Sequence, residues 1–407
     1  MSSHHSTGHP EQRAGRIACG VSQAEDPERA CHEVLEAVAP AMAGETDLAV
    51  VFFSREHVSR AGQISSIFQD HLAPGVLIGS SAISVLGNDV ELESEPGVAC
   101  MAASWPGVTL EPFFEGDLDW PGSADDPALL RKSVHDSENL RAIMLLADPF
   151  TPLVRLLPAL STAIRRSPDL PSIPIFGGVA SAGIRPGENR FLYQDQIRLK
   201  GIVGLSISGP IRVDTIVSQG CRPIGRPLII TKASRNIIEG LGGKAALEAL
   251  QETLFEMSPA DREKIDQGLY VGRVVNEYQE RFGRGDFLIR QVVGVDRDRG
   301  FLVINDFVRV GQTIQFQIRD QRTATEDLEL LLTAQQIDDP PMGGLLFTCN
   351  GRGSNLFDAR HHDVRTIRRA LPDLPLAGFF AAGEIGPVGS DSFLHGHTAS
   401  LAVFRSM

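Results

Sequence analysis

A pattern of strand, helix and strand recurs three times along this chain of 407 residues, and it constrains the fold more than any other feature. Each copy opens with a short apolar run, which is typical of a strand buried on both faces. Each copy closes, after a nearby Pro, on an apolar residue, a Gly, two further residues and an Ala. The opening runs lie at 48–53, 143–147 and 345–348, and the closing signatures lie at 78–82, 176–180 and 377–381.

The spacing within the copies predicts how these strands pair. From the opening residue to the signature glycine the chain advances 31, 34 and 33 residues, to Gly79, Gly177 and Gly378. This is the length of a βαβ unit, so we expect the two strands to be parallel and joined by a right-handed crossover. A further apolar strand follows in each copy. We interpret the signature glycines as architectural, because glycine allows close backbone packing or a bulge in a strand.

The fold class that follows is α/β, with repeated strand–helix–strand–strand units that form mixed sheets. A different, β-rich region lies between the second and third copies. We interpret it as a meander insert that begins with helices at 233–241 and 244–256, and a further helix at 320–336 follows it. Because the insert separates the first two copies from the third, we expect two lobes.

Charge and composition narrow the classes of function. The formal net charge is −13, and an acidic surface disfavours both nucleic acids and anionic membranes. No stretch reaches the roughly 18 apolar residues of a membrane-spanning helix. Five scattered cysteines without a CxxC pair favour reduced thiols and a cytoplasmic location. Residues 1–16 lack the apolar core of a signal peptide, so we expect a disordered tail in which His4, His5 and His9 bind metal loosely at most.

The third copy carries a carboxylate where its sister copies carry none. Six residues after the signature glycine, the first two copies have Val85 and Gly183, whereas the third has Glu384. A carboxylate on a strand is costly to bury without a partner. We therefore expect Glu384 to face solvent, to pair with a group such as Arg352, or to bind a ligand.

The turn after the opening strand of the third copy has the composition of an anion site. It reads Cys-Asn-Gly-Arg-Gly-Ser-Asn at 349–355, and its two glycines allow backbone N–H groups to point into a concavity. Arg352 between them can bind a carboxylate or phosphate through two hydrogen bonds. Ser354 or Asn355 is a suitable N-cap for a following helix, whose positive end also favours an anion. The alternative is a tight turn with an exposed arginine.

Two further residues of the third copy bear on possible chemistry. His395 lies just before the last strand and can hydrogen-bond Glu384 or a ligand. Cys349 ends a buried strand before an expected helix start, a position that lowers the pKa of a thiol. An enzyme with Cys349 as nucleophile, His395 as base and Glu384 as orienting acid is therefore an alternative. An inert core cysteine is the other interpretation of Cys349.

Taken together, these motifs resemble the FIST family. The resemblance covers nearly the whole chain after the tail, and it implies a sensory module that binds a small ligand, with amino acids as suggested ligands. The chain looks like a stand-alone version, without an F-box or a signalling-output domain. The third-copy motifs, at 347–353, 378–387 and 393–396, are similar to a FIST C domain. The earlier motifs, at 51–54 and 176–178, are similar to a FIST N domain.

The leading hypothesis is a small-ligand sensor in intracellular signal transduction, with a FIST N domain at 17–225 and a FIST C domain at 226–407. We expect its output partner to be a separate signalling protein, and we expect no cofactor and no metal. The turn would hold an anionic group such as an α-carboxylate, and Glu384 a cationic group such as an α-amine. A protein-interaction scaffold built from three repeats is a further alternative. The predicted ligand-binding residues are Asn350, Gly351, Arg352, Gly353, Gly383, Glu384 and His395.

Overall fold

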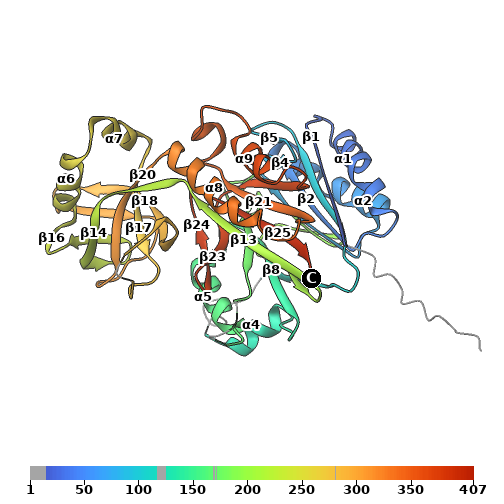
Figure 1. Cartoon of the computed structure of the whole chain (residues 1–407), viewed down its shortest axis with the longest axis horizontal. Coiled ribbons are helices and arrows are strands. Elements are labelled where there is room, and N and C mark those ends of the chain that lie inside the picture. The colour runs from blue at the N-terminus through green and yellow to red at the C-terminus, as the bar shows by residue number, and fades with distance from the viewer. Residues whose placement is uncertain (1–14, 117–124, 168–169, 171, 280) are drawn as a thin grey trace, which may run out of the picture.

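A computed structural model describes residues 15–116, 125–167, 170, 172–279 and 281–407 (Figure 1). The predicted tail, with His4, His5 and His9, lies outside these residues up to residue 14, and Arg16 already begins the first strand. In the part of the chain described here, no helix is both long enough and apolar enough to cross a membrane.

The three repeats together form three six-stranded mixed sheets, which share one strand order. The first sheet runs β1 (Arg16–Ser22), β6 (Val98–Ser104), β2 (Leu48–Ser54), β3 (Val76–Ala82), β10 (Phe191–Tyr193) and β11 (Gln196–Arg198). The second runs β7 (Thr109–Glu115), β12 (Ile202–Ser208), β8 (Leu140–Ala147), β9 (Ile175–Val179), β23 (Glu384–Val388) and β24 (Asp391–His395). The third runs β13 (Ile211–Gln219), β25 (Thr398–Ser406), β21 (Gly343–Cys349), β22 (Leu376–Ala381), β4 (Val85–Gly87) and β5 (Val90–Leu92).

The predicted pairing within each repeat is confirmed. The opening strand and the signature strand are parallel in all three copies, as β2 with β3, β8 with β9, and β21 with β22. At the signature glycines the two backbones touch. A Cβ atom at Gly79, Gly177 or Gly378 would lie 2.1, 2.0 or 1.8 Å from a carbonyl oxygen of the opening strand. The architectural interpretation of these glycines is therefore correct.

The last two strands of every sheet come from a different repeat. The hairpin β4–β5 of the first repeat joins the third sheet, β10–β11 of the second repeat joins the first sheet, and β23–β24 of the third repeat joins the second sheet. Each hairpin is antiparallel to a signature strand. The repeats are therefore tied into a closed ring by exchanged hairpins, which the sequence did not indicate.

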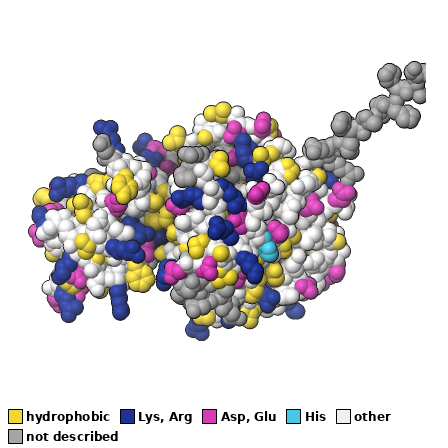
Figure 2. Space-filling view, turned by 90° about the horizontal axis from the view of Figure 1, so that it is seen from below, with side chains coloured by type: hydrophobic (Ala, Val, Ile, Leu, Met, Phe, Trp, Pro, Cys, Tyr) yellow, Lys and Arg dark blue, Asp and Glu magenta, His cyan; other side chains and the backbone are white. Residues whose placement is uncertain are grey.

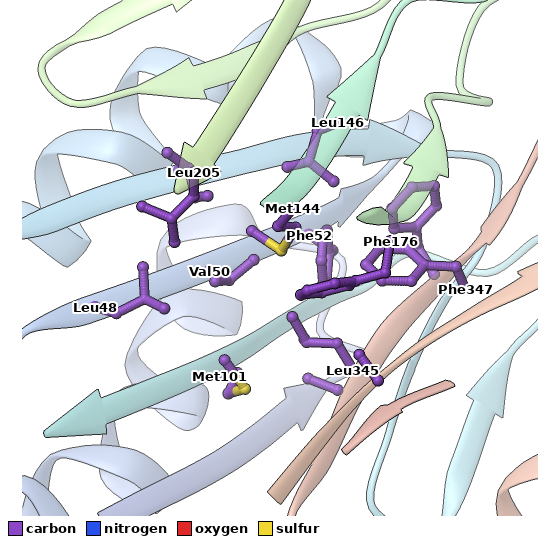
Figure 3. Packing of buried hydrophobic residues seen from close by; sticks show 14 of the residues in the cluster. Leu48, Val50, Phe52, Met101, Met144, Leu146, Phe176, Leu205, Leu345 and Phe347 are labelled. Atoms are coloured by element: carbon purple, nitrogen blue, oxygen red, sulfur yellow. The ribbon is translucent and has the colours of Figure 1, made fainter. Parts of the chain in front are cut away.

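Helices cover the outer face of each sheet, and the inner faces meet in one core. The pairs are α1 (Pro27–Met42) with α2 (Ala61–Leu72), α4 (Pro127–Ser133) with α5 (Leu153–Ile164), and α8 (Gln321–Gln335) with α9 (His362–Ala370). Figure 3 shows Phe52, Met144 and Phe347, one residue from the opening strand of each repeat, together in the shared core. The expected division between the second and third copies is therefore wrong, because all three repeats bury their inner faces against one another.

The insert forms the second lobe by itself, at the left of Figure 1. Its seven-stranded sheet has the order β14, β20, β17, β18, β19, β15, β16, and β14 also pairs with β15, which closes six of the strands into a barrel. The predicted helix at 233–241 is wrong: β-branched Ile237 and Ile238, with Gly240, form a strand instead. Its elements are β14 (Cys221–Ser234), β15 (Ile237–Leu241), β16 (Lys244–Ala245), α6 (Ala246–Glu256), α7 (Pro259–Glu263), β17 (Leu269–Val274), β18 (Phe287–Asp296), β19 (Phe301–Ile304) and β20 (Thr313–Arg319).

We call this part the insert lobe and the three repeats the repeat lobe. The two are joined by a neck of two adjacent backbone segments, where the Asp320 N–H donates to the Gly220 carbonyl oxygen. On the face shown in Figure 2, basic and acidic side chains are interspersed over both lobes.

Candidate functional site

Arg352 lies in the turn after β21, and its side chain is buried. The alternative of a tight turn with an exposed arginine is therefore wrong. Its Nε and Nη2 donate to the two carboxylate oxygens of Asp363, each at 2.8 Å. The Thr348 hydroxyl donates to the same carboxylate at 2.7 Å. Burial alone would raise the pKa of Asp363, but the charge and hydrogen bonds of Arg352 hold it well below its usual value. Arg352 Nη1 has no hydrogen-bond partner among the described residues.

The predicted anion position in this turn is filled by a carboxylate of the chain itself. Glu93, which follows β5 of the first repeat, accepts hydrogen bonds from the Ser354 N–H at 2.8 Å and the Ser354 hydroxyl at 2.6 Å. The predicted helix start at Ser354 or Asn355 is wrong. Gly353–Asn355 forms one 3-10 turn, and α9 begins only at His362. The exchanged hairpin therefore explains why no external anion is needed at Ser354.

Glu384 begins β23 and is fully buried. Its Oε2 accepts hydrogen bonds from the Thr398 N–H at 3.1 Å and the Thr398 hydroxyl at 2.8 Å, whereas Oε1 has no partner among the described residues. Burial raises the pKa of Glu384 to about 8, although Thr398, Arg352 and the side chain of the neighbouring Cys349 act in the opposite direction. At neutral pH the ligand-free carboxyl group is therefore mainly protonated.

Strand register corrects the comparison of Glu384 with its sister positions. In each sheet the residue after the signature glycine pairs with the exchanged hairpin, and the partners are Phe191, Glu384 and Val85. Phe191, not Gly183, is thus the equivalent in the second repeat. Phe191 and Val85 both lie in the shared apolar core. The carboxylate of the third repeat stands where both sisters carry an apolar side chain.

Three other predicted site residues contact the protein's own backbone. His395 Nε2 lies 3.0 Å from the Gly386 carbonyl oxygen, and burial lowers the pKa of His395 to about 4. The Asn350 side chain, oriented so that its nitrogen faces carbonyl groups, donates to Phe380 at 2.8 Å. The Gly383 carbonyl accepts from the Val179 N–H at 2.9 Å.

The geometry contradicts the prediction of an activated thiol at Cys349. Burial raises the pKa of Cys349, and the nearby Glu384 acts in the same direction. Its Sγ accepts a hydrogen bond from the Gly351 N–H at 3.4 Å. The imidazole of His395, the proposed base, is engaged with Gly386 instead. The set of nucleophile, base and acid is therefore not assembled.

The sequence did not indicate that the insert lobe contributes to this region. Arg319, at the end of β20, donates through Nη2 to the carbonyl oxygens of Gly351 and Asn355, the latter at 3.2 Å. The rings of Tyr270 and His397 pack edge to face, with centroids 4.4 Å apart. No local pattern marks these residues, because their role depends on how the two lobes meet.

We call Cys349, Arg352, Asp363, Glu384, His397 and Arg319 the junction cluster, because they gather where the lobes meet. Four of these side chains have a buried polar atom without a hydrogen-bond partner among the described residues. Buried polar atoms are rarely left unpaired, so each of them calls for a reason. The atoms are Arg352 Nη1, Glu384 Oε1, His397 Nδ1 and Arg319 Nε.

A hollow lies next to the cluster on the outer surface. It measures about 340 Å³ and lies between the start of α8 and the segment before α9. Phe357 and His362 line it, with their rings stacked at 3.4 Å. The Arg352 guanidinium carbon lies 5.2 Å from the centre of the Phe357 ring. One aromatic layer thus separates this hollow from the junction cluster.

The fold and this site together define a repeat α/β protein with a closed polar cluster between two lobes. A FIST N domain model matches residues 47–244, and a FIST C domain model matches residues 246–387. The chain belongs to the FIST family, as its motifs predicted. FIST domains are associated with the sensing of small ligands in signalling.

Two similar proteins from mycobacteria align with this chain over nearly its whole length. An uncharacterized protein of Mycobacterium tuberculosis is 41% identical over 393 residues, which cover 96% of this chain and 99% of the relative. An uncharacterized protein of Mycobacterium bovis is 38% identical over 392 residues, which cover 96% and 98%. A solved cyanuric acid hydrolase from A. caulinodans aligns with 97% of this chain and 99% of its own, at a TM-score of 0.35 and 8% identity, which is too low to support a conclusion.

Proposed function

We propose that this protein is a sensory protein that binds an amino acid or a similar small metabolite in the junction cluster. The observation that carries the proposal is that Arg352 and Glu384 are 1% and 0% exposed and each keeps one polar atom unpaired. Leaving such an atom without a partner costs about 1–3 kcal/mol. A ligand that supplies the missing partners would recover this free energy.

The two side chains suit the two ends of an amino acid. Arg352 Nη1 can donate to the α-carboxylate, while the other two nitrogens remain with Asp363. Glu384 Oε1 can accept from the α-amine. We assign Asn350, Gly351, Gly353, Gly383 and His395 to shaping the site, because the contacts described above lie within the protein.

The protonation of Glu384 makes this proposal sensitive to pH. A bound ammonium group favours the ionised carboxylate, so binding at pH 7 releases a proton from Glu384. The affinity for an amine-bearing ligand should therefore rise as the pH increases toward about 8. Calorimetry in two buffers of different ionisation enthalpy measures this proton release.

A ligand must open the cluster to enter, because its side chains are buried. The hollow beside Phe357 and His362 offers a short route, since only the aromatic layer has to move. The His362 ring has two hydrogen bonds that must break for it to move, one between Nε2 and the Thr325 hydroxyl of α8 at 2.9 Å and one between Nδ1 and the Asp363 carboxylate at 3.1 Å.

The test is a binding screen with the twenty amino acids, followed by thermal unfolding. A ligand at 100 times its dissociation constant should stabilise the protein by about 2.7 kcal/mol. Glu384→Gln should weaken the binding of amine-bearing ligands. The matched control is Glu95→Gln, because Glu95 is a surface carboxylate paired with Arg360. Equal affinity in Glu384→Gln and the control would refute the site.

We also propose a cytoplasmic location and a separate signalling protein as the output partner. The acidic net charge of −13 and the family membership support this proposal. A protein-interaction scaffold remains the second candidate, supported by the ring of exchanged hairpins. The same screen separates the two, because a scaffold without a ligand site gains no stability from any metabolite.

A further inference from the structure

Arg319 differs from Arg352, the other arginine of the junction cluster, in having no carboxylate partner among the described residues. Arg352 is paired with Asp363. The Arg319 guanidinium instead donates to two backbone carbonyl groups of the turn at 351–355, and its buried Nε has no partner. These carbonyl groups, and the Tyr270 hydroxyl that Arg319 also contacts, carry no negative charge to balance that of the guanidinium.

The remaining members of the cluster do not balance this charge. The Arg352–Asp363 pair is neutral overall. Burial keeps Glu384 mainly protonated at neutral pH, and it raises the pKa of Cys349. Burial and the two arginines lower the pKa of His397 to about 4, so its imidazole is neutral. The cluster therefore carries one uncompensated positive charge, located on Arg319.

Two glycines lie directly against the unpaired atoms of the cluster. A Cβ atom built on Gly351 would lie 3.2 Å from His397 Nδ1 and 3.6 Å from Arg319 Nη2. A Cβ atom built on Gly220, in the neck, would lie 2.5 Å from the His397 carbonyl oxygen and 3.2 Å from Arg352 Nη1. A larger residue at Gly351 would therefore press against His397 Nδ1, and one at Gly220 against the His397 carbonyl oxygen and Arg352 Nη1.

We propose that Arg319 of the insert lobe and Nη1 of Arg352 of the repeat lobe together bind a carboxylate group of the ligand. This inference rests on the proposed function, since it concerns the same site, and it narrows the ligand to small carboxylates. A carboxylate has two oxygens that can accept charge-assisted hydrogen bonds from two guanidinium groups at once. An amine without a carboxylate leaves the Arg319 charge uncompensated and is excluded as the ligand.

The proposal has a consequence for sensing. Because one arginine comes from each lobe, a bound carboxylate links the insert lobe to the repeat lobe beside the neck at Gly220 and Asp320. Ligand binding then strengthens the contact between the lobes. Hydrogen exchange in the segment 350–356 should slow when the ligand binds.

The experiment uses three probes on the full chain at constant ionic strength: acetate, which has only a carboxylate, methylamine, which has only an amine, and glycine, which has both. Binding is followed by calorimetry and thermal unfolding. The variants are Arg319→Gln, Arg319→Lys, Gly351→Ala and the control Arg284→Gln. Arg284 also spans the lobes, through an ion pair of 3.5 Å with Glu326, but it is not part of the cluster.

We expect acetate and glycine to bind the wild-type protein and the control, and methylamine not to bind. Arg319→Gln should weaken both carboxylates about 10- to 100-fold, with partial rescue in Arg319→Lys. Gly351→Ala should weaken them without removing a charge, and it decides the matter if Arg319→Gln does not fold.

Each other outcome is decisive. If glycine binds Arg319→Gln as tightly as the wild type, the role of Arg319 is refuted while the proposed function stands. If methylamine binds and acetate does not, the proposal that the two arginines bind a carboxylate group is refuted. If none of the probes binds the wild type, both this inference and the proposed site fail.

Discussion

The Asp363 carboxylate accepts two hydrogen bonds of 2.8 Å from the Arg352 guanidinium, and both side chains are 1% exposed. A buried ion pair of this geometry is expensive to break, because removing one partner leaves the other charge buried and alone. The pair therefore fixes the turn after β21 to the start of α9. It also explains why Arg352 has a single nitrogen left for another contact.

Asp363→Asn should destabilise the protein by about 3–5 kcal/mol, because it leaves the Arg352 charge buried without a counter-charge. Urea unfolding followed by circular dichroism measures this change. Glu95→Gln, which removes an exposed partner of Arg360, should cost no more than about 1 kcal/mol. Similar small losses in both variants would contradict the buried pair.

The stability of the protein should fall as the pH rises from about 6.5 to about 8. Below about 6.5 the buried His395 and His397, which stay neutral in the folded state but gain a proton on unfolding, act in the opposite direction. Above this pH the folded state retains protons on Glu384 and on Glu91, a buried residue of β5 that accepts a hydrogen bond from the Val364 N–H. Burial raises the pKa values of both to about 8, whereas the unfolded state has lost these protons. Each group contributes a slope of up to about 1.4 kcal/mol per pH unit. Unfolding in urea at several pH values should show that Glu384→Gln removes part of this slope. An unchanged slope would show that Glu384 titrates normally.

Replacement of a signature glycine by alanine should be severely destabilising in each repeat. Gly79→Ala, Gly177→Ala and Gly378→Ala each place a Cβ atom within about 2 Å of a backbone oxygen that cannot move aside. We expect losses of at least about 3 kcal/mol, at the upper end of overpacking costs. Gly62→Ala is the control, because it lies in α2 with open space around it and should change stability by about 1 kcal/mol or less. Thermal unfolding of the four variants is the measurement.

The native protein should react slowly with thiol reagents. All five cysteines are free and buried, and burial raises the pKa of Cys349. At pH 7.5 we expect labelling of Cys349 to be at least about 10-fold slower than that of a free thiol. Labelling should reach all five thiols after unfolding in guanidinium chloride. Fast reaction of Cys349 in the native state, lost in Cys349→Ser, would revive the cysteine-dependent alternative.

Much of each repeat was readable from the sequence. The opening and signature strands could be recognised as short apolar runs, because a strand that is buried on both faces carries apolar side chains on both. The recurring signature glycines indicated that two backbones approach closely, and the structure has this close approach in all three repeats. By contrast, the helix predicted at 233–241 failed, since a short apolar stretch with β-branched residues fits both structures until its neighbours are known.

The site was harder to predict, since its contacts cross between repeats. Glu93 and Ser354 are separated by 261 residues, and they meet only because the hairpin β4–β5 joins the third sheet. Arg319, which the insert lobe contributes to the junction cluster, is not marked by any motif in the surrounding sequence.

The amino-acid sequence by itself determined the three repeats and the glycines where two backbones pack closely. It also showed that the third copy carries charged residues, Arg352 and Glu384, that distinguish it from its sister copies. Local periodicity and residue type carry that information, because they reflect the burial of each segment by itself. The partners of those charges came from the folded molecule. Asp363 neutralises Arg352, Glu93 fills the turn, and Arg319 approaches from the insert lobe, since electrostatic pairing depends on which distant segments are brought together.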